Sequence, residues 1–327
     1  MLNRQLYIID GIKNMTEATA INPVLEIKEK VFASTFYFPD IYSITLCYLR
    51  LYEYYLSREK MLELITKAIK NPRRAAEKTW NILRRTQHQG QCSICGIETI
   101  MYKYGKSLTE TNKCKKCGAI ARNRHLAIVL CKVFGVEKPF SMKKFVENSK
   151  DLAVYEAQGK GPLNFHLKKL QGYACSEYDP DVQPGSNIQE GIRCEDLQNL
   201  TFEDETFDLV ITQTVFEHIL EPDKAWKEIA RVLKPSGYHI FSIPFQNSPI
   251  TERRVKIDDG EEIFIMTKVY HNDGVRNSLV YTDYGLDLLD HLKDFGFSTE
   301  LHSLGDMDSN TYRIDGGYIF ISLKDRH

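Results

Sequence analysis

The sequence predicts an α/β fold for its second half, a doubly wound and mostly parallel sheet with helices on both faces. From about residue 150 onward, short apolar segments alternate with helical patterns, which is typical of βαβ units. Two pairs of cysteines precede this region, and a long helical pattern precedes the cysteines. With 327 residues and 43% hydrophobic side chains, the chain is long and apolar enough for two domains, or for one large domain with an appendage.

The element predictions follow from local hydrophobic patterns. We expect strands at residues 152–157, 173–177, 207–212, 238–243, 298–304 and 318–323. We expect helices between them at residues 162–170, 222–233 and 284–295. The first part of the chain has helical periodicity, so the predicted parts are a helical segment at 1–90, a cysteine-rich ribbon with a connecting helix at 91–148, and the α/β domain at 149–327.

The net charge of −1 hides an uneven distribution of charge along the chain. Residues 58–85 carry nine basic and three acidic side chains, and residues 103–124 carry seven basic and one acidic. Residues 174–208 carry ten acidic side chains and one basic. Opposite charge in two regions suggests two modules that face different partners. Basic segments attract phosphates or anionic lipids, and a solvated helix face is the alternative interpretation.

Two kinds of segment are not found in the sequence. No run reaches the roughly 18 apolar residues that a membrane-spanning helix needs. The first residues lack the apolar core and the cleavage site of a signal peptide. We therefore expect a cytoplasmic protein, in which paired cysteines bind metal more often than they form disulfides.

The strongest local pattern is a spacing of two C-x-x-C pairs that is typical of a metal site. Gly96 and Gly118 each follow the second cysteine of a C-x-x-C pair, where such a turn often needs a positive φ. Four thiolates complete a tetrahedral zinc ion and leave no open position, so the site is expected to be structural. Four ordinary buried thiols, or a redox-active pair, are the alternatives. The pairs are separated by 18 residues and consist of Cys92, Cys95, Cys114 and Cys117.

A loop with two glycines follows the first predicted strand. The segment 156–161 reads Glu-Ala-Gln-Gly-Lys-Gly, and a helix is expected to begin at Pro162. A strand, a glycine loop and a helix N-terminus together can hold an anionic group of a ligand. Glu177 ends the next strand, where a carboxylate can accept hydrogen bonds from both ribose hydroxyls of a nucleoside. Farther on, Asp196 precedes another strand and can bond an adenine amine, although both acids could also be plain surface carboxylates.

The stretches FDLV…FEHI and EIARVLKPSG extend this pattern. On these residues, 152–244 resemble a class I S-adenosylmethionine-dependent methyltransferase of the type 11 kind. With the four-cysteine ribbon and the run Arg122-Asn-Arg-His-Leu, the chain resembles bacterial zinc-ribbon methyltransferases over roughly residues 90–325. The resemblance implies a seven-stranded, Rossmann-like sheet whose last strand is antiparallel, with S-adenosylmethionine as cofactor beside a structural Zn²⁺. A nicotinamide-dinucleotide domain is the main alternative.

The resemblance also implies roles for individual residues. Glu177 would hold the ribose, and Asp196 with Leu197 would hold the adenine. Gln213 would form the wall beside the sulfonium. Gln158 stands where the family has a glycine, which suggests a shifted loop or a weakened cofactor site. The methionine end of the cofactor would be lined by Glu156, Gln158, Gly159 and Gly161.

A hydroxyl acceptor must lose a proton when it is methylated, which requires a nearby base. The candidate bases are His218, just after the strand expected at 207–212, and His271, in an inserted segment before the last helix. For His218 the alternative is packing against Glu217, and for His271 it is a plain surface position. The acceptor is expected to be a small molecule or a glycan. RNA bound by the basic ribbon is an alternative, and a third is a non-catalytic binding module with a degenerate methyltransferase fold.

Overall fold

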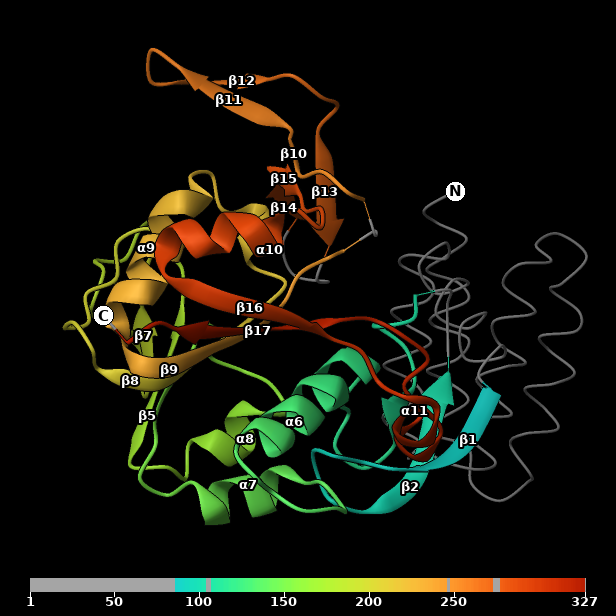
Figure 1. Cartoon of the computed structure of the whole chain (residues 1–327). Coiled ribbons are helices and arrows are strands. Elements are labelled where there is room, and N and C mark those ends of the chain that lie inside the picture. Colours follow the sequence, from blue (N-terminus) through green and yellow to red (C-terminus); the bar gives the residue numbers. More distant parts are fainter. Residues whose placement is uncertain (1–85, 104–106, 246–247, 273–276, 327) are drawn as a thin grey trace, which may run out of the picture. The chain divides into compact units, whose positions relative to one another are not determined.

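A computed structural model of the chain describes residues 86–103, 107–245, 248–272 and 277–326 (Figure 1). Residues from Gln87 onward form one compact unit. The predicted helical segment 1–90 lies outside the described residues except for 86–90, which belong to strand β1 (Thr86–Gln91). The division of the remaining chain at residues 148 and 149 stays a prediction.

The centre of the unit is a mixed sheet of eight strands, one more than the seven predicted. The central strands β5, β4, β8 and β9 pair in parallel. Strand β17 pairs antiparallel with β9, as the resemblance implies for the last strand. The additional strand is β6, a short edge strand paired with β7. The spatial order is β16 (Phe297–His302), β17 (Ile319–Lys324), β9 (Leu233–Ser242), β8 (Phe207–Gln213), β4 (Ala153–Glu156), β5 (Gly172–Glu177), β7 (Ile192–Cys194) and β6 (Asn187–Gln189).

Alternating side chains on the central strands form a hydrophobic core on each face of the sheet. On β4, Val154 belongs to one core and Tyr155 to the other. On β8, Leu209 and Ile211 face the first core, and Val210 faces the second. Because both faces are covered, these strands are apolar at nearly every position and are recognised as continuous hydrophobic runs.

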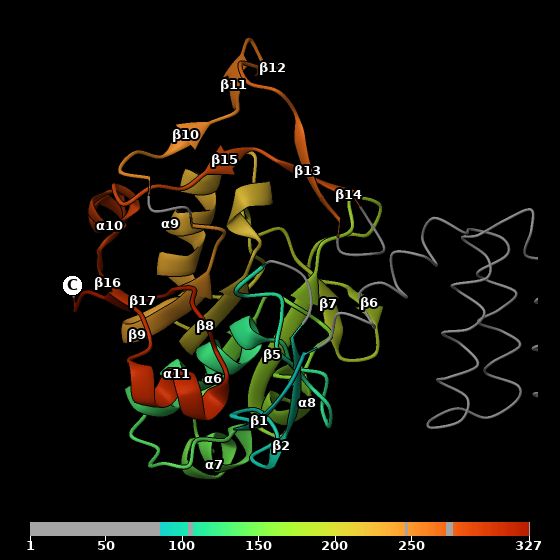
Figure 2. The same cartoon turned by 90° about the vertical axis from the view of Figure 1, so that its right-hand side faces the viewer.

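Helices cover both faces, as the alternation of strands and helices predicts (Figures 1 and 2). Helix α9 (Pro222–Val232) begins with a proline in its first turn and packs Ala225, Trp226 and Ile229 against the second core. The short helix α10 (Leu288–His291) lies on the same face and continues as the 3₁₀ turn η3 (Leu292–Phe295). The opposite face carries α6 (Ala121–Val133), α7 (Met142–Asn148) and α8 (Asn164–Leu167).

Helix α8 is shorter than predicted. The sequence predicts a helix from Pro162 to Leu170, but regular helix covers only four residues, and turns flank it on both sides. A single helical turn sums few peptide dipoles, so the expected contribution of a helix N-terminus at this loop is small. The helix expected at 284–295 is likewise divided between α10 and η3.

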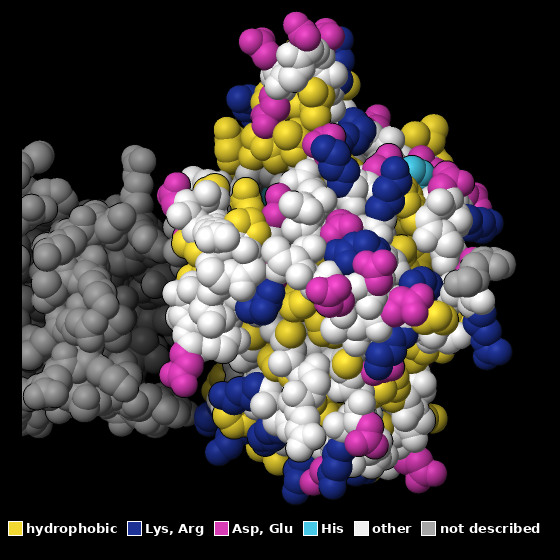
Figure 3. Space-filling view, turned by 90° about the vertical axis from the view of Figure 1, so that its left-hand side faces the viewer, with side chains coloured by type: hydrophobic (Ala, Val, Ile, Leu, Met, Phe, Trp, Pro, Cys, Tyr) yellow, Lys and Arg dark blue, Asp and Glu magenta, His cyan; other side chains and the backbone are white. Residues whose placement is uncertain are grey.

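Three pairs of antiparallel strands between β9 and α10, two of which are hairpins, form an insertion that the element predictions did not include. They pair β10 (Glu252–Arg253) with β15 (Thr282–Asp283), β11 (Val255–Asp258) with β12 (Glu261–Phe264), and β13 (Val269–Asn272) with β14 (Asn277–Val280). The β11–β12 hairpin projects from the unit, with acidic side chains at its tip and hydrophobic side chains below (Figure 3). The β13–β14 hairpin instead contacts the 3₁₀ turn η2 (Phe216–His218), which follows β8.

The cysteine ribbon packs on the same core as α6. Its strands are β1, β2 (Glu98–Lys103) and β3 (Lys113–Cys114), and its Ile94 and Met101 are fully buried in the core that includes Leu126 of α6. After β16, helix α11 (Asp306–Tyr312) lies next to the ribbon (Figure 2). Described residues contain no helix long and apolar enough to cross a membrane.

Arg124 connects these elements. Its side chain is completely buried, and its guanidinium donates hydrogen bonds to the carbonyl oxygens of Asn112 (2.5 Å), Ala119 (2.8 Å), Tyr312 (3.2 Å) and Arg313 (2.8 Å). A planar group with five N–H donors can satisfy carbonyls that belong to separate chain segments. One side chain thus joins the ribbon, α6 and the segment after α11.

Replacing Arg124 with alanine should lower the free energy of unfolding by about 3 kcal/mol or more, because four hydrogen bonds to buried or partly buried carbonyls would be lost. Denaturant titration of the full chain measures this. Arg326→Ala is the control, since the exposed Arg326 donates to the Ser236 hydroxyl near the surface, and its loss should change the free energy by about 0.5 kcal/mol or less. Equal losses in the two variants would contradict the role given to Arg124.

Candidate functional site

Three predicted site residues end neighbouring strands at one edge of the sheet. Glu156 is the last residue of β4, Glu177 of β5 and Gln213 of β8. These strands pair in parallel, so their carboxyl ends lie at the same edge. Ligands of open α/β sheets bind outside this edge.

The glycine loop, residues 157–163, is held against the end of β5. The backbone N–H of Gly159 donates a hydrogen bond to Glu177 Oε1 over 3.1 Å. A Cβ at Gly159 would lie 2.6 Å from a methyl carbon of Ile192 and 3.1 Å from Glu177 Cγ, so a larger residue does not fit here without displacing its neighbours. The exposed Glu177 carboxylate therefore points to the loop.

Glu156 is a buried carboxyl group with a free oxygen. The Tyr173 hydroxyl donates to its Oε2 over 2.6 Å, and its Oε1 has no hydrogen-bond partner. Burial raises the pKa of Glu156 to about 8, and the neighbouring charge of Glu177 adds to this rise. A buried acceptor without a donor is unfavourable, so this atom suits a ligand that brings a donor or a positive charge.

Three side-chain amides form a chain from α6 to the glycine loop. Asn123 Nδ2 donates to Gln213 Oε1 over 3.0 Å, and Gln213 Nε2 donates to Gln158 Oε1 over 3.3 Å. Gln158 also lies over Gly161, where a Cβ would be 3.4 Å from Gln158 Nε2. The residue that departs from the family pattern thus bonds to the residue predicted to line the wall beside the sulfonium.

Asp196 and Leu197 follow β7, next to the end of β5. The backbone N–H of Glu195 donates to the Glu177 carbonyl over 3.1 Å, which keeps the two segments together. Asp196 is half-buried, and its Oδ1 accepts hydrogen bonds from the backbone and the side chain of Gln198 at 2.9 and 3.2 Å. Leu197 is 7% exposed and belongs to the second core.

The four predicted metal-binding cysteines come together in the ribbon. Their sulfur atoms all lie within 4.8 Å of one another, with 3.7 Å between Cys92 and Cys117 and 3.9 Å between Cys95 and Cys114. Gly96 and Gly118 have φ values of 75° and 76°, which confirms the positive φ expected after each pair. The contact with the Cys117 thiol holds the pKa of Cys114 well below its usual value. All described cysteines are free of disulfides.

The two predicted histidine bases also come together, and they do so around a glutamate. We call Glu217, His218 and His271 the Glu-His-His cluster. Their ligating atoms lie within 4.8 Å of one another, and the rings of His218 and His271 are perpendicular, with centroids 5.0 Å apart. The contact with the Glu217 carboxylate raises the pKa of His271. Glu217 itself is buried, although sequence reasoning treated it only as a packing partner of His218.

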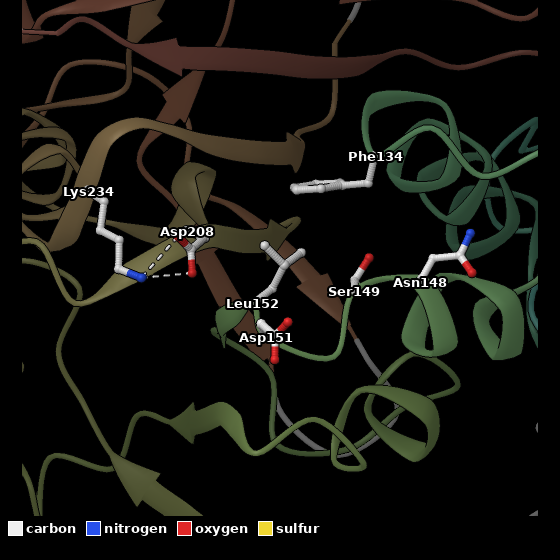
Figure 4. A pocket seen from close by; sticks show the side chains of 7 residues that line it. All are labelled: Phe134, Asn148, Ser149, Asp151, Leu152, Asp208 and Lys234. Carbon is white, nitrogen blue, oxygen red and sulfur yellow. Dashed lines mark hydrogen bonds and ion pairs between the residues drawn. The ribbon is translucent and has the colours of Figure 1, made fainter.

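A cavity of about 380 Å³ lies at the opposite edge of the sheet (Figure 4). It lies beside the amino ends of β8 and β9, where Lys234 bonds to both carboxylate oxygens of Asp208 at 3.0 and 2.9 Å. It therefore belongs to the edge away from the predicted site residues. Its lining consists of Phe134, Asn148, Ser149, Asp151, Leu152, Asp208 and Lys234.

Part of the α/β domain is similar to a known family. Residues 166–241 match the family model described as a methyltransferase domain. The matched segment runs from α8 to β9, includes Glu177, Asp196 and Gln213, and begins after the glycine loop. Over these residues the chain is similar to a methyltransferase domain, which supports the predicted enzyme class, an S-adenosylmethionine-dependent methyltransferase.

One curated relative is an uncharacterized protein of Methanocaldococcus jannaschii, 31% identical over 130 residues, which are 40% of this chain and 53% of the relative. The chain thus spans about half the length of this relative. Two similar solved structures are a Burkholderia thailandensis 1,6-didemethyltoxoflavin-N1-methyltransferase with bound S-adenosylhomocysteine (15% identity, 62% of this chain, 77% of that chain, TM-score 0.36) and a Methanosarcina mazei S-adenosylmethionine-dependent methyltransferase (18%, 54%, 94%, TM-score 0.32). Similarities of this size carry no weight for the acceptor or the partners of this chain.

Sequence reasoning missed three residues that contact the predicted site. Asn123 lies in the Arg122-Asn-Arg-His run, which was noted only as part of the resemblance. Tyr173 brings a hydroxyl into strand β5, whose other residues before Glu177 are apolar or small. Glu217 directly precedes a candidate base. Each of these signals is local, but the contact itself joins distant segments.

The raised pKa of Glu156 makes stability depend on pH. The folded protein binds the proton more tightly than the unfolded chain, whose glutamate has an ordinary pKa of 4.5. The stability contributed by this group is therefore complete below about pH 4.5 and is lost as the pH rises toward about 8. Glu156→Gln should remove this loss, so that the free energy of unfolding falls less between about pH 5 and pH 9 than in the wild type.

Denaturant titrations across this pH range, without ligand, measure the effect. Glu190→Gln is the control, because Glu190 is exposed in a turn and its loss should leave the slope unchanged. The burial of Glu156 would have no such consequence if the slopes of wild type and Glu156→Gln were the same.

Proposed function

We propose that the protein transfers a methyl group from S-adenosylmethionine to a hydroxyl or amine of a small-molecule or glycan acceptor. One observation carries the proposal: Gly159 and Glu177, from two neighbouring strand ends, are joined by a hydrogen bond at the carboxyl edge of the sheet. The tight loop and the free Oε1 of the buried Glu156 suit a nucleoside that carries a positively charged amino acid.

In this proposal the residues keep the roles that the resemblance implies. The free Oε1 of Glu156 would pair with the ammonium group of the cofactor. The exposed Glu177 would accept hydrogen bonds from the ribose hydroxyls, with Asp196 and Leu197 beside the adenine. Gln213 would be held in place by Asn123. The methionine end would be lined by Glu156, Gln158, Gly159 and Gly161.

Bound S-adenosylmethionine supplies an activated methyl group, which an acceptor lone pair displaces in line from the sulfur, leaving S-adenosylhomocysteine. The residues of this chain would align the two molecules and exclude water. A hydroxyl acceptor must also lose its proton, and we assign this task to the Glu-His-His cluster, which follows Gln213 at the end of β8. An amine with a free lone pair would need no such help.

We further propose that the four cysteines bind one structural Zn²⁺. Zn–S bonds of about 2.3 Å in a tetrahedron place sulfurs about 3.8 Å apart, and the sulfur pairs here are separated by 3.7 and 3.9 Å. Four thiolates leave no position for substrate, so the ion would hold the ribbon together. Because Asn123 lies in the first turn of the helix that follows the ribbon and bonds to Gln213, the ion would also support the cofactor site.

The internal pairing of basic side chains favours a small acceptor over RNA. Lys103 pairs with Asp315 at 2.5 Å, and Arg122 with Glu110 at 2.9 Å. Arg124 is buried and bonded to carbonyls. Of the seven basic side chains of segment 103–124, two are therefore in ion pairs and a third is buried, which weakens the phosphate attraction that the composition suggests.

Binding of the cofactor is measured by calorimetry with S-adenosylmethionine and the full chain. Glu177→Ala should weaken the affinity about 10- to 100-fold, because hydrogen bonds to a charged acceptor contribute about 1.5–3 kcal/mol. Glu190→Ala removes the same charge from the same acidic stretch at an exposed turn and should bind like the wild type. A wild-type protein that binds no S-adenosylmethionine would favour the non-catalytic module, and salt-dependent retention of RNA on a filter by the full chain would favour an RNA acceptor.

Removal of the metal should destabilise the protein and weaken cofactor binding as well. By native mass spectrometry, Cys114→Ser should hold one equivalent of zinc less than the wild type, and its cofactor affinity should fall about tenfold through the weakened support of Asn123. Cys131→Ala changes another buried thiol, outside the cluster, and should keep the zinc. A zinc content in Cys114→Ser equal to that of the wild type would count against the four-thiolate site.

A further inference from the structure

Glu217 is a buried acid that has ion-pair contacts with two histidines but no side-chain hydrogen bond among the described residues. Its side chain is 2% exposed, and neither carboxylate oxygen has a hydrogen-bond partner among the described residues. It lies in η2, directly after the strand that ends at Gln213. Burial of a carboxylate is strongly unfavourable unless a cation or a proton compensates it. At Glu217 this compensation must come from a proton shared with the two histidines or from a bound cation.

Two histidine nitrogens face the same carboxylate oxygen. His218 Nε2 and His271 Nδ1 each lie 3.7 Å from Glu217 Oε1. These distances are too long for hydrogen bonds, but they are short enough for one ion of about 2 Å bond length to reach all three atoms after a small adjustment. His218 comes from η2, whereas His271 comes from the β13–β14 hairpin, which packs against η2.

A hydrogen bond to the backbone fixes the tautomer of His218. Its Nδ1 lies 2.7 Å from the carbonyl oxygen of Leu279. A carbonyl oxygen only accepts, so Nδ1 carries the proton, and Nε2 of the neutral ring presents a lone pair to Glu217. Two acceptors that face each other repel unless a positive charge lies between them. Metal-binding histidines characteristically donate their second N–H to a carbonyl in this way.

We propose that Glu217, His218 and His271 bind a divalent transition-metal ion, in addition to the ion of the ribbon. Two imidazoles and one carboxylate are a ligand set of Zn²⁺, Fe²⁺ and related ions rather than of Ca²⁺ or Mg²⁺. Three protein ligands leave at least one coordination position open. The ion satisfies both histidine lone pairs and the buried carboxylate at once.

If the protein has the proposed function, the position of this ion allows it to bind the methyl acceptor. It would lie at the carboxyl edge of the sheet, on the segment that follows Gln213. Its open position would take an oxygen of the acceptor, and coordination lowers the pKa of a bound hydroxyl. The acceptor class would then be a hydroxylated small molecule or glycan, with the metal in place of a free histidine base.

The experiment titrates Co²⁺ into full-length protein whose ribbon has first been filled with one equivalent of Zn²⁺. The wild type should bind one further equivalent, with d–d absorption but without thiolate-to-cobalt charge transfer. Glu217→Gln and His271→Ala should weaken this binding at least about tenfold. The His271 side chain is 44% exposed, so its alanine variant should fold even if Glu217→Gln does not.

His291→Ala is the matched control. This side chain is also 44% exposed and lies 2.9 Å from the Asp223 carboxylate, but it stands outside the cluster, so the second equivalent should bind as in the wild type. Failure of the wild type to bind the second equivalent, charge-transfer bands that place it on cysteines, or full binding by His271→Ala would each overturn the proposal. Calorimetry with S-adenosylmethionine on the same samples distinguishes this failure from a failure of the proposed function.

Discussion

The parallel pairing of β4 with β5 on one side and β8 on the other is the constraint on which the candidate site depends. Parallel strands end at the same edge, so Glu156, Glu177 and Gln213 become neighbours although they lie far apart in the chain. Burial of both faces holds these strands in one register, because a shift of one residue would exchange the two cores. The geometry of the site therefore follows from the same packing that stabilises the domain.

Helix α6 connects the edge of the sheet to the ribbon. Its side chains reach both the core and the site: Arg124 binds carbonyls of the ribbon, and Asn123 bonds to Gln213. The ribbon is consequently part of the support of the sheet edge, because the first turn of the helix that follows it bonds to Gln213. This arrangement gives the ribbon a positioning task within its own chain.

The insertion between β9 and α10 completes the other end of the site. The β13–β14 hairpin brings His271 to Glu217 and His218, and the backbone N–H of Tyr281 donates to the Glu217 carbonyl over 2.8 Å. A short 3₁₀ turn after β8 and a hairpin from the insertion thus form one polar cluster close to Gln213, the last residue of β8. Neither segment could form it alone, since the carboxylate and one of the two rings lie on different elements.

The sequence by itself determined the periodic features: the central strands, helix α9 and the two C-x-x-C turns, because alternation, helical spacing and Gly96 or Gly118 are local properties. It also determined which acids end their strands, since Glu156 and Glu177 close apolar runs. Only the tertiary structure decided the bond from Gly159 to Glu177, the amide chain through Asn123 and the isolation of the Glu217 carboxylate. These depend on which distant segments the packing brings together, and no spacing along the chain encodes that.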